Sequence, residues 1–237
     1  MSKKSSSKTN FLAQGTILVI ASFVAKAIGM IYRIPLTHIL GDDGNGYYST
    51  ANEIYTIILM ISSFSLPLAV SRLVAEREYA GEVKNSYKVL ICSLRFAAVT
   101  GGILSILTFL LGGVITKYVM GVELASYALR VLAPAIFLFA LTGVLRGFFQ
   151  GHGTMVPTAV SQIIEQIINA IVSVAGAYVM LQYGLKLGEK KGDAELGTAL
   201  AAAGGTFGTV ASVGVALLFM IVIYLGYRNG FKPVSYT

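Results

Sequence analysis

Six long apolar stretches dominate this sequence, and each is long enough to cross a lipid bilayer as an α-helix. The hydrocarbon core of a bilayer is ~30 Å thick, so a helix needs about 20 residues to span it. The stretches comprise residues 11–40, 47–70, 89–115, 124–149, 156–181 and 196–227. They lack the alternation of apolar and polar residues that a transmembrane strand shows. We therefore predict an all-α, polytopic integral membrane protein with six transmembrane helices.

The composition is that of a membrane protein and not of a water-soluble domain. Hydrophobic residues make up 55% of the 237 residues and charged residues only 12%, whereas soluble domains carry about 25% charged residues. We predict three parts: a basic cytoplasmic tail at residues 1–10, a six-helix transmembrane lobe at residues 11–228, and a cytoplasmic link at residues 229–237.

Lys and Arg residues are distributed unevenly between the two sides of the membrane. If the N-terminus is cytoplasmic, the segments on its side hold ten Lys and Arg residues, against four on the other side. Cytoplasmic loops of membrane proteins carry an excess of these residues, so we predict that both termini are cytoplasmic. The same bias accounts for most of the net charge of +7, which therefore gives no reason to expect a nucleic-acid partner.

Two of the predicted outer connections are rich in polar residues. Residues 41–46 read Gly-Asp-Asp-Gly-Asn-Gly, a composition typical of turns. Residues 184–195 carry charges of both signs. We expect both segments to be solvated loops.

Lys26 and Arg33 are basic residues within the first predicted helix. They are seven residues apart, so they lie roughly 10 Å apart along the helix and on nearly the same face. A charge near the middle of a bilayer costs at least about 2.5 kcal/mol, so such residues usually have a partner or face a water-filled cavity. We predict that both, with Glu53 on the second helix, line a substrate cavity. The alternatives are a salt bridge to Glu53 and extension of the side chains to the lipid head groups.

The fifth predicted helix carries a polar stripe of four residues, Gln162, Glu165, Gln166 and Asn169. Offsets of three, four and seven residues place them on one face of the helix, and isoleucines fill the other side. The stripe should therefore face protein or water and not lipid. It either lines the cavity predicted for Lys26 or holds neighbouring helices together through hydrogen bonds.

The segment at residues 146–159 is the most distinctive in the sequence, and it reads Arg-Gly-Phe-Phe-Gln-Gly-His-Gly-Thr-Met-Val-Pro-Thr-Ala. We interpret it as a tight turn between the fourth and fifth helices, because glycine permits the backbone conformations that turns need. Glycines spaced by four residues also allow another helix to approach closely. The residues that define this loop are Arg146, Gly147, Gln150, Gly151, Gly153 and Pro157.

This segment, with Ser161-Gln162 and Glu165-Gln166 after it, strongly resembles the SpoVB-type polysaccharide-biosynthesis proteins. These are relatives of the lipid II flippase MurJ in the MOP exporter superfamily, which has a MATE-like fold. The first helix agrees with the resemblance, since its residues are similar to the family's opening helix and turn at Lys26, Gly29, Arg33, Pro35 and Gly41. The resemblance covers essentially the whole chain.

The resemblance implies a carrier of lipid-linked saccharides in a bacterial cytoplasmic membrane, built from two six-helix lobes around a cavity that opens to each side in turn. It also implies that the basic residues of the first helix, here Lys26 and Arg33, attract the pyrophosphate of the substrate. Family members are about twice as long, so this chain would supply the first lobe, and residues 229–237 would lead to the second. A second lobe or a second copy is then needed to close the cavity.

Three functions remain open at this point: flipping of lipid-linked oligosaccharide or peptidoglycan precursors, MATE-like antiport of organic cations, and a non-transporting scaffold role in cell-envelope assembly. A cation site needs acidic or aromatic lining, so Lys26 and Arg33 favour the flippase, whereas Glu53 and Glu165 are compatible with the antiporter. The sequence has no H-E-x-x-H or G-x-S-x-G motif and only two histidines. We therefore expect no enzyme, no metal site and no cofactor.

Overall fold

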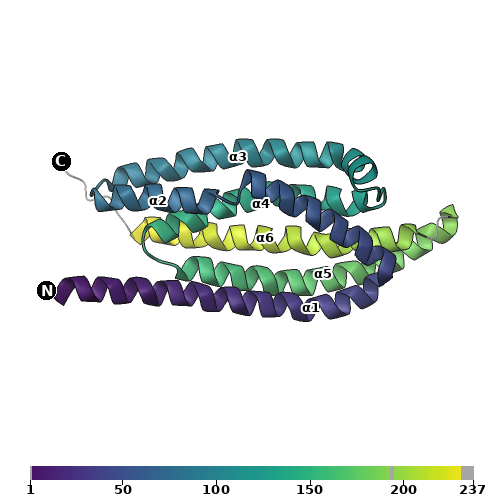
Figure 1. Cartoon of the computed structure of the whole chain (residues 1–237), viewed down its shortest axis with the longest axis horizontal. Helices are drawn as coiled ribbons and strands as arrows, with labels where there is room; N and C mark the ends of the chain where they lie inside the picture. Colours follow the sequence, from purple (N-terminus) through teal and green to yellow (C-terminus); the bar gives the residue numbers. More distant parts are fainter. Residues whose placement is uncertain (1, 193–194, 231–237) are drawn as a thin grey trace.

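Helices make up all the secondary structure in the described residues, 2–192 and 195–230, of this computed structural model. The elements are α1 (Ser2–Ser62), α2 (Leu66–Tyr79), α3 (Val83–Val114), a π-helical turn η1 (Ile115–Val119), α4 (Ala125–Gly151), α5 (Val156–Lys191) and α6 (Leu196–Gly230). They form one elongated bundle with their axes roughly along its length (Figure 1). The prediction of an all-α protein is confirmed. Residues 231–237, most of the predicted link, lie outside the described residues.

A sharp bend at Gly41 divides α1 into two arms. The backbone of Gly41 has φ 65° and ψ −172°, a conformation that only glycine adopts readily. The chain reverses direction there, and the second arm, residues 42–62, runs back along the bundle (Figure 1). The turn predicted at residues 41–46 is therefore confined to this one residue, since the helix resumes directly after it.

Among the described residues, five helical units are long and apolar enough to cross a membrane, and the first, Gln14–Tyr79, contains most of the first arm of α1, its second arm and α2. Six spans were predicted, and they correspond to five units because the first unit contains the first two predicted spans. The bend at Gly41 folds this unit back on itself. A turn at residues 63–65 also interrupts the second predicted span, and Pro67 lies in the first turn of α2, where a missing N–H group does no harm.

The loop predicted at residues 184–195 is wrong over its first part, because α5 continues to Lys191. Lys, Glu and Leu are all good helix formers, so the charges do not interrupt the helix. Gly192 ends it with φ 70°, the left-handed conformation common after helix C-termini.

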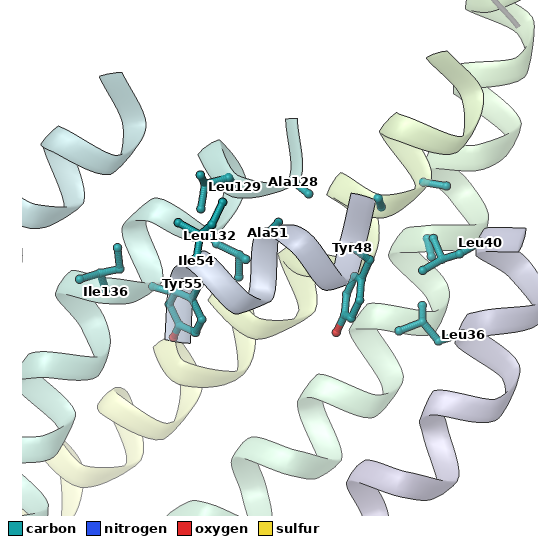
Figure 2. Packing of buried hydrophobic residues seen from close by; sticks show 14 residues of the cluster. Leu36, Leu40, Tyr48, Ala51, Ile54, Tyr55, Ala128, Leu129, Leu132 and Ile136 are labelled. Carbon is teal, nitrogen blue, oxygen red and sulfur yellow. The ribbon is translucent and has the colours of Figure 1, made fainter. Parts of the chain in front are cut away.

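The core lies where the two arms of α1 meet α4, α5 and α6 (Figure 2). Buried side chains from all five segments pack there: Leu36, Leu40, Tyr48, Ala51, Ile54, Tyr55, Ala128, Leu129, Leu132, Ala135, Ile136, Ala177, Ala201 and Ala202. Leucine and isoleucine fill the space between the helices, while alanines let α4, α5 and α6 approach closely. This packing holds both arms of α1 against α4, α5 and α6.

α5 and α6 are in backbone contact along much of their length. A Cβ atom placed on Gly176 would lie 2.5 Å from the carbonyl oxygen of Gly204, and one placed on Gly184 would lie 2.9 Å from the Cα of Gly197. Small residues at helix interfaces are typical of membrane proteins, in which close packing replaces the hydrophobic effect between helices.

Much of the outer surface is apolar. On α3 the exposed side chains include Ile103, Ile106, Phe109 and Leu110, each more than half exposed. Their spacing places them along one face of the helix, and such a continuous apolar face is what lipid solvates. The chain is a multi-pass membrane protein.

Candidate functional site

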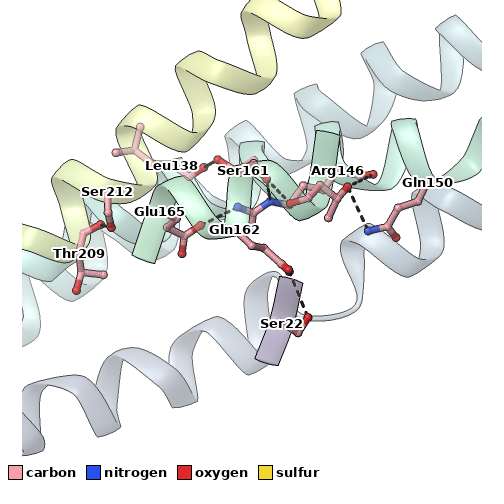
Figure 3. A network of polar contacts seen from close by, with 11 residues as sticks. Ser22, Leu138, Arg146, Gln150, Ser161, Gln162, Glu165, Thr209 and Ser212 are labelled. Carbon is pink, nitrogen blue, oxygen red and sulfur yellow. Dashed lines mark hydrogen bonds and ion pairs between the residues drawn. The ribbon is translucent and has the colours of Figure 1, made fainter. Parts of the chain in front are cut away.

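The polar stripe of α5 faces α1 and α4, and its residues make hydrogen bonds there. Ser22 Oγ on the first arm of α1 donates to Gln162 Oε1 at 3.4 Å (Figure 3). Two turns further along α5, Asn169 Nδ2 donates to the hydroxyl oxygen of Tyr32 at 3.0 Å. Gln166 lies between them, partly buried against the same arm. In this structure the stripe joins α5 to α1.

Glu165, the acidic residue of the stripe, forms a buried ion pair with Arg146 of α4. Arg146 Nη2 lies 2.7 Å from Glu165 Oε2, and the two side chains are only 9% and 15% exposed (Figure 3). Arg146 Nε also donates to Ser161 Oγ at 2.9 Å, and that hydroxyl donates to the carbonyl oxygen of Thr158 at 2.7 Å. The two charges therefore neutralise each other inside the bundle.

The loop predicted at residues 146–159 is shorter than expected. α4 continues to Gly151, so Arg146, Gly147 and Gln150 are helical and not part of a turn. The turn comprises residues 152–155, in which Gly153 has φ 76°. Pro157, also assigned to the loop, lies in the first turn of α5, where proline is well tolerated.

The glycines of this segment serve helix packing, which is why they lie inside α4. A Cβ atom on Gly147 would lie 2.5 Å from the carbonyl oxygen of Pro67, and one on Gly151 would lie 2.6 Å from Cβ of Val74. Both partners belong to α2. The close helix approach predicted from the four-residue spacing is thus confirmed, with α2 as the approaching helix.

Lys26, Arg33 and Glu53 are all exposed. Within the described residues, none of the three has an oppositely charged group within 4.0 Å. The salt bridge to Glu53 that the sequence offered as an alternative is therefore not formed. The charges of these residues remain available to a ligand.

Arg33 and Glu53 line one groove of about 560 Å³ between the two arms of α1, which we call the α1 groove. Tyr32, Asn52 and Thr56 add hydroxyl and amide groups to its wall. Lys26 lies outside it, in a smaller groove of about 230 Å³ beside Ser22. The structure thus brings together Arg33 and Glu53, and it separates them from Lys26 and from the α5 stripe.

The sequence interpretation overlooked the polar face of the second arm of α1. Four residues there, Ser49, Asn52, Glu53 and Thr56, line the α1 groove. Their offsets of three, four and seven residues repeat the pattern of the α5 stripe, so the same periodicity argument could have found them. Only Glu53 was singled out, because it alone is charged.

Thiol labelling distinguishes the groove from the stripe. In a Cys92→Ser background we expect Glu53→Cys to react readily with a membrane-impermeant maleimide, because the side chain is exposed on a polar groove. Asn169→Cys should stay protected, since Asn169 is only 8% exposed. Ile34→Cys, on the exposed apolar face of the first arm, is the control for a lipid-facing position. Similar labelling rates at positions 53 and 169 would contradict the assignment.

Comparison with known proteins gives a family and a fold. The family described as "Polysaccharide biosynthesis protein" matches residues 11–233. Stage V sporulation protein B of Bacillus subtilis (strain 168) is 28% identical over 217 residues, which are 92% of this chain and 39% of that protein. Lipid II flippase MurJ of the same organism is 29% identical over 180 residues, which are 72% of this chain and 33% of that protein. The chain thus spans well under half the length of these curated relatives.

Among solved structures, an outward-facing multidrug resistance MATE family transporter of the MOP superfamily has the same fold. The TM-score is 0.75 at 18% sequence identity, and the match covers 96% of this chain and 49% of that chain. The bundle therefore has the fold of about half of a MATE-type transporter.

Proposed function

This chain belongs to the polysaccharide biosynthesis protein family, and from that premise we propose that it forms the first lobe of a lipid-linked saccharide flippase. The substrates would be lipid-linked oligosaccharides or peptidoglycan precursors. Their polar head groups would cross the cytoplasmic membrane along a polar path by alternating access, while the lipid tails stay in the bilayer. No covalent bond changes in such a process.

The observation that carries this proposal is the position of Arg33, an exposed cation on the α1 groove with no acidic group within 4.0 Å among the described residues. A charge on a membrane-spanning segment is costly and marks functional sites by default. The guanidinium group presents five donors in a planar fork that matches phosphate oxygens. We infer that Arg33 binds the pyrophosphate of the substrate.

The remaining groups of the α1 groove suit the saccharide. Asn52 offers both donors and acceptors, and Glu53 offers acceptors, which sugar hydroxyls can use. Lys26, two helical turns from Arg33, supplies a second positive charge on the same arm of α1. In this proposal Lys26 attracts the anionic head group as a point charge and does not bind it in the α1 groove.

Antiport of organic cations has less support. Of the two acidic residues that suggested it, Glu165 is paired with Arg146 inside the bundle and cannot serve an incoming cation without breaking that pair. Glu53 remains, but it shares its groove with Arg33. The scaffold hypothesis does not account for an unpaired arginine on a polar groove.

We also infer that a second lobe, or a second copy of the chain, covers the α1 groove in the working transporter. The matched MATE chain is about twice as long as the part that this chain covers. The basic residues of the sequence favour an arrangement with both termini in the cytoplasm.

The test is the substitution Arg33→Ala, made in the complete two-lobe assembly. Binding of a pyrophosphate-linked lipid should weaken by about 1.5–3 kcal/mol, the contribution of a hydrogen bond to a charged group, which is about a 10–150-fold increase in Kd. Arg33→Lys should recover only part of the loss, because it restores the charge without the planar fork. Binding is measured by titration in detergent micelles.

Arg95→Ala is the matched control, since Arg95 is an exposed arginine on α3 that does not line the α1 groove. It should leave the affinity unchanged. If Arg33→Ala binds the lipid normally while Glu53→Ala abolishes uptake of an organic cation, the flippase proposal fails and antiport replaces it.

A further inference from the structure

A second charged groove, of about 420 Å³, lies between α2 and α3. Its lining residues are Leu73, Arg77, Asn85, Lys88, Val89, Cys92 and Ser93. The turn that joins the two helices lies at the end of the bundle where α1 begins and α6 ends (Figure 1). We propose that this α2–α3 groove binds the head group of an anionic phospholipid. This groove is lined by α2 and α3, whereas the α1 groove is lined by α1. The proposal of lipid binding therefore does not depend on the proposed saccharide transport.

The charged residues of the groove lie at one end of it. The turn at residues 80–82 between α2 and α3 has charged residues in and beside it, among them Arg77, Glu82 and Lys88, and because charges are costly inside a bilayer we place this turn at the membrane surface. Arg77 and Lys88 lie near this turn, whereas Leu73 and Cys92 lie one turn deeper on their respective helices. A phospholipid has the same order, with a charged phosphate at the surface and acyl chains beneath it.

The charges at the mouth of the groove favour an anion. Arg77 Nη1 donates to Glu82 Oε2 at 2.9 Å, and Asn85 Nδ2 donates to the same oxygen at 2.8 Å. These two hydrogen bonds hold the pKa of the Glu82 carboxyl below its usual range, and the bond from Asn85 has the larger effect. Glu82 therefore stays ionised and orients Arg77 at the mouth of the groove. Lys88 is exposed and has no carboxylate within 4.0 Å among the described residues, so two cations face one carboxylate.

The apolar surroundings favour a lipid over a free phosphate ion. Leu73, which lines the groove, is 46% exposed, and Ile91 and Phe96, on the same stretch of α3 as the lining residue Cys92, are 48% and 57% exposed; a soluble anion would leave these side chains uncovered. The volume lies within the range of about 300–1,000 Å³ that is usual for ligand sites. Basic pockets between membrane helices are known recognition sites for anionic head groups.

Lipid binding to the full chain is tested by native mass spectrometry from detergent micelles, where no charged membrane surface contributes. The chain should bind phosphatidylglycerol in preference to phosphatidylcholine, and Lys88→Gln should reduce this preference about tenfold, which corresponds to ~1.4 kcal/mol, near the lower end for a hydrogen bond between charged groups. Lys88→Arg should retain it. Lys84→Gln is the matched control, since Lys84 is an exposed lysine one turn earlier on α3 that does not line the groove.

Cys92 gives a second readout, because it is the only cysteine of the chain, is exposed, and lines the groove. Its alkylation by N-ethylmaleimide should slow when phosphatidylglycerol is added and not when phosphatidylcholine or inorganic phosphate is added. Equal losses for Lys84→Gln and Lys88→Gln would overturn the proposal in favour of diffuse surface charge. Protection of Cys92 by inorganic phosphate alone would overturn the assignment to a lipid.

Discussion

Arg146→Ala is expected to destabilise the bundle by about 3–5 kcal/mol, the usual cost of breaking a buried ion pair. The substitution leaves Glu165, with a side chain 15% exposed, as a buried carboxylate without its partner. It also removes the donor to Ser161 Oγ. The free energy of unfolding in detergent micelles, measured by denaturant titration followed by circular dichroism, checks this.

The double substitution Arg146→Met with Glu165→Leu separates charge from packing. Replacing both members of a buried pair by apolar residues of similar size is often neutral or stabilising, so the double variant should regain most of the lost stability. Arg77→Ala breaks an exposed ion pair for comparison. Arg77 and Glu82 are paired at 2.9 Å but are 47% and 42% exposed. Exposed pairs contribute only about 0–1 kcal/mol to the free energy of unfolding, so this substitution should change stability little. A double variant as unstable as Arg146→Ala would contradict this account.

Gly204→Leu should separate α5 from α6 and destabilise the bundle by about 3 kcal/mol, the upper part of the usual range for overpacking. A Cβ atom at position 204 would lie 2.7 Å from the carbonyl carbon of Gly176 and 2.8 Å from Cβ of Met180. The first of these contacts is with backbone, which cannot move aside by changing a rotamer. Thermal unfolding in micelles should show a lower Tm.

Gly226→Leu is the matched control on the same helix, because no atom lies within 4 Å of a Cβ atom at that position. There the change should be neutral or slightly stabilising, since leucine favours helix more than glycine does. Equal destabilisation at positions 204 and 226 would show that loss of glycine itself, and not the α5–α6 contact, is responsible.

The membrane-spanning helices could be predicted because length and hydropathy alone define them. Where helices end was harder to predict. Residues 184–191 were assigned to a loop from their charges, yet Lys and Glu extend α5 in the structure. Likewise, Arg146 and Gly147 were assigned to a turn from their glycine-rich surroundings, although those glycines serve the contact with α2. Composition does not distinguish a glycine that permits a turn from one that permits close packing.

The spacing of polar residues along a helix was readable from the sequence, but their pairings were not. The α5 stripe was predicted to face protein or water, and in the structure it faces α1 and α4. That Glu165 meets Arg146 depends on how α4 and α5 lie against each other, which no local pattern encodes. The grouping of Arg33 with Glu53 depends in turn on the reversal at Gly41. The proposed roles of Lys26, Arg33 and Glu53 in substrate binding remain predictions.

The Arg146–Glu165 pair has a consequence for biosynthesis. A charged residue at the centre of a lone helix raises the free energy of membrane insertion by about 2.5–3.5 kcal/mol, and Arg146 and Glu165, five and nine residues from the facing ends of α4 and α5, would each carry part of that cost alone. α4 and α5 are joined by only the short turn at residues 152–155, so the two charges leave the ribosome close together in time and on adjacent helices. We expect the two helices to leave the translocon as a hairpin, in which each charge has already neutralised the other before either meets lipid.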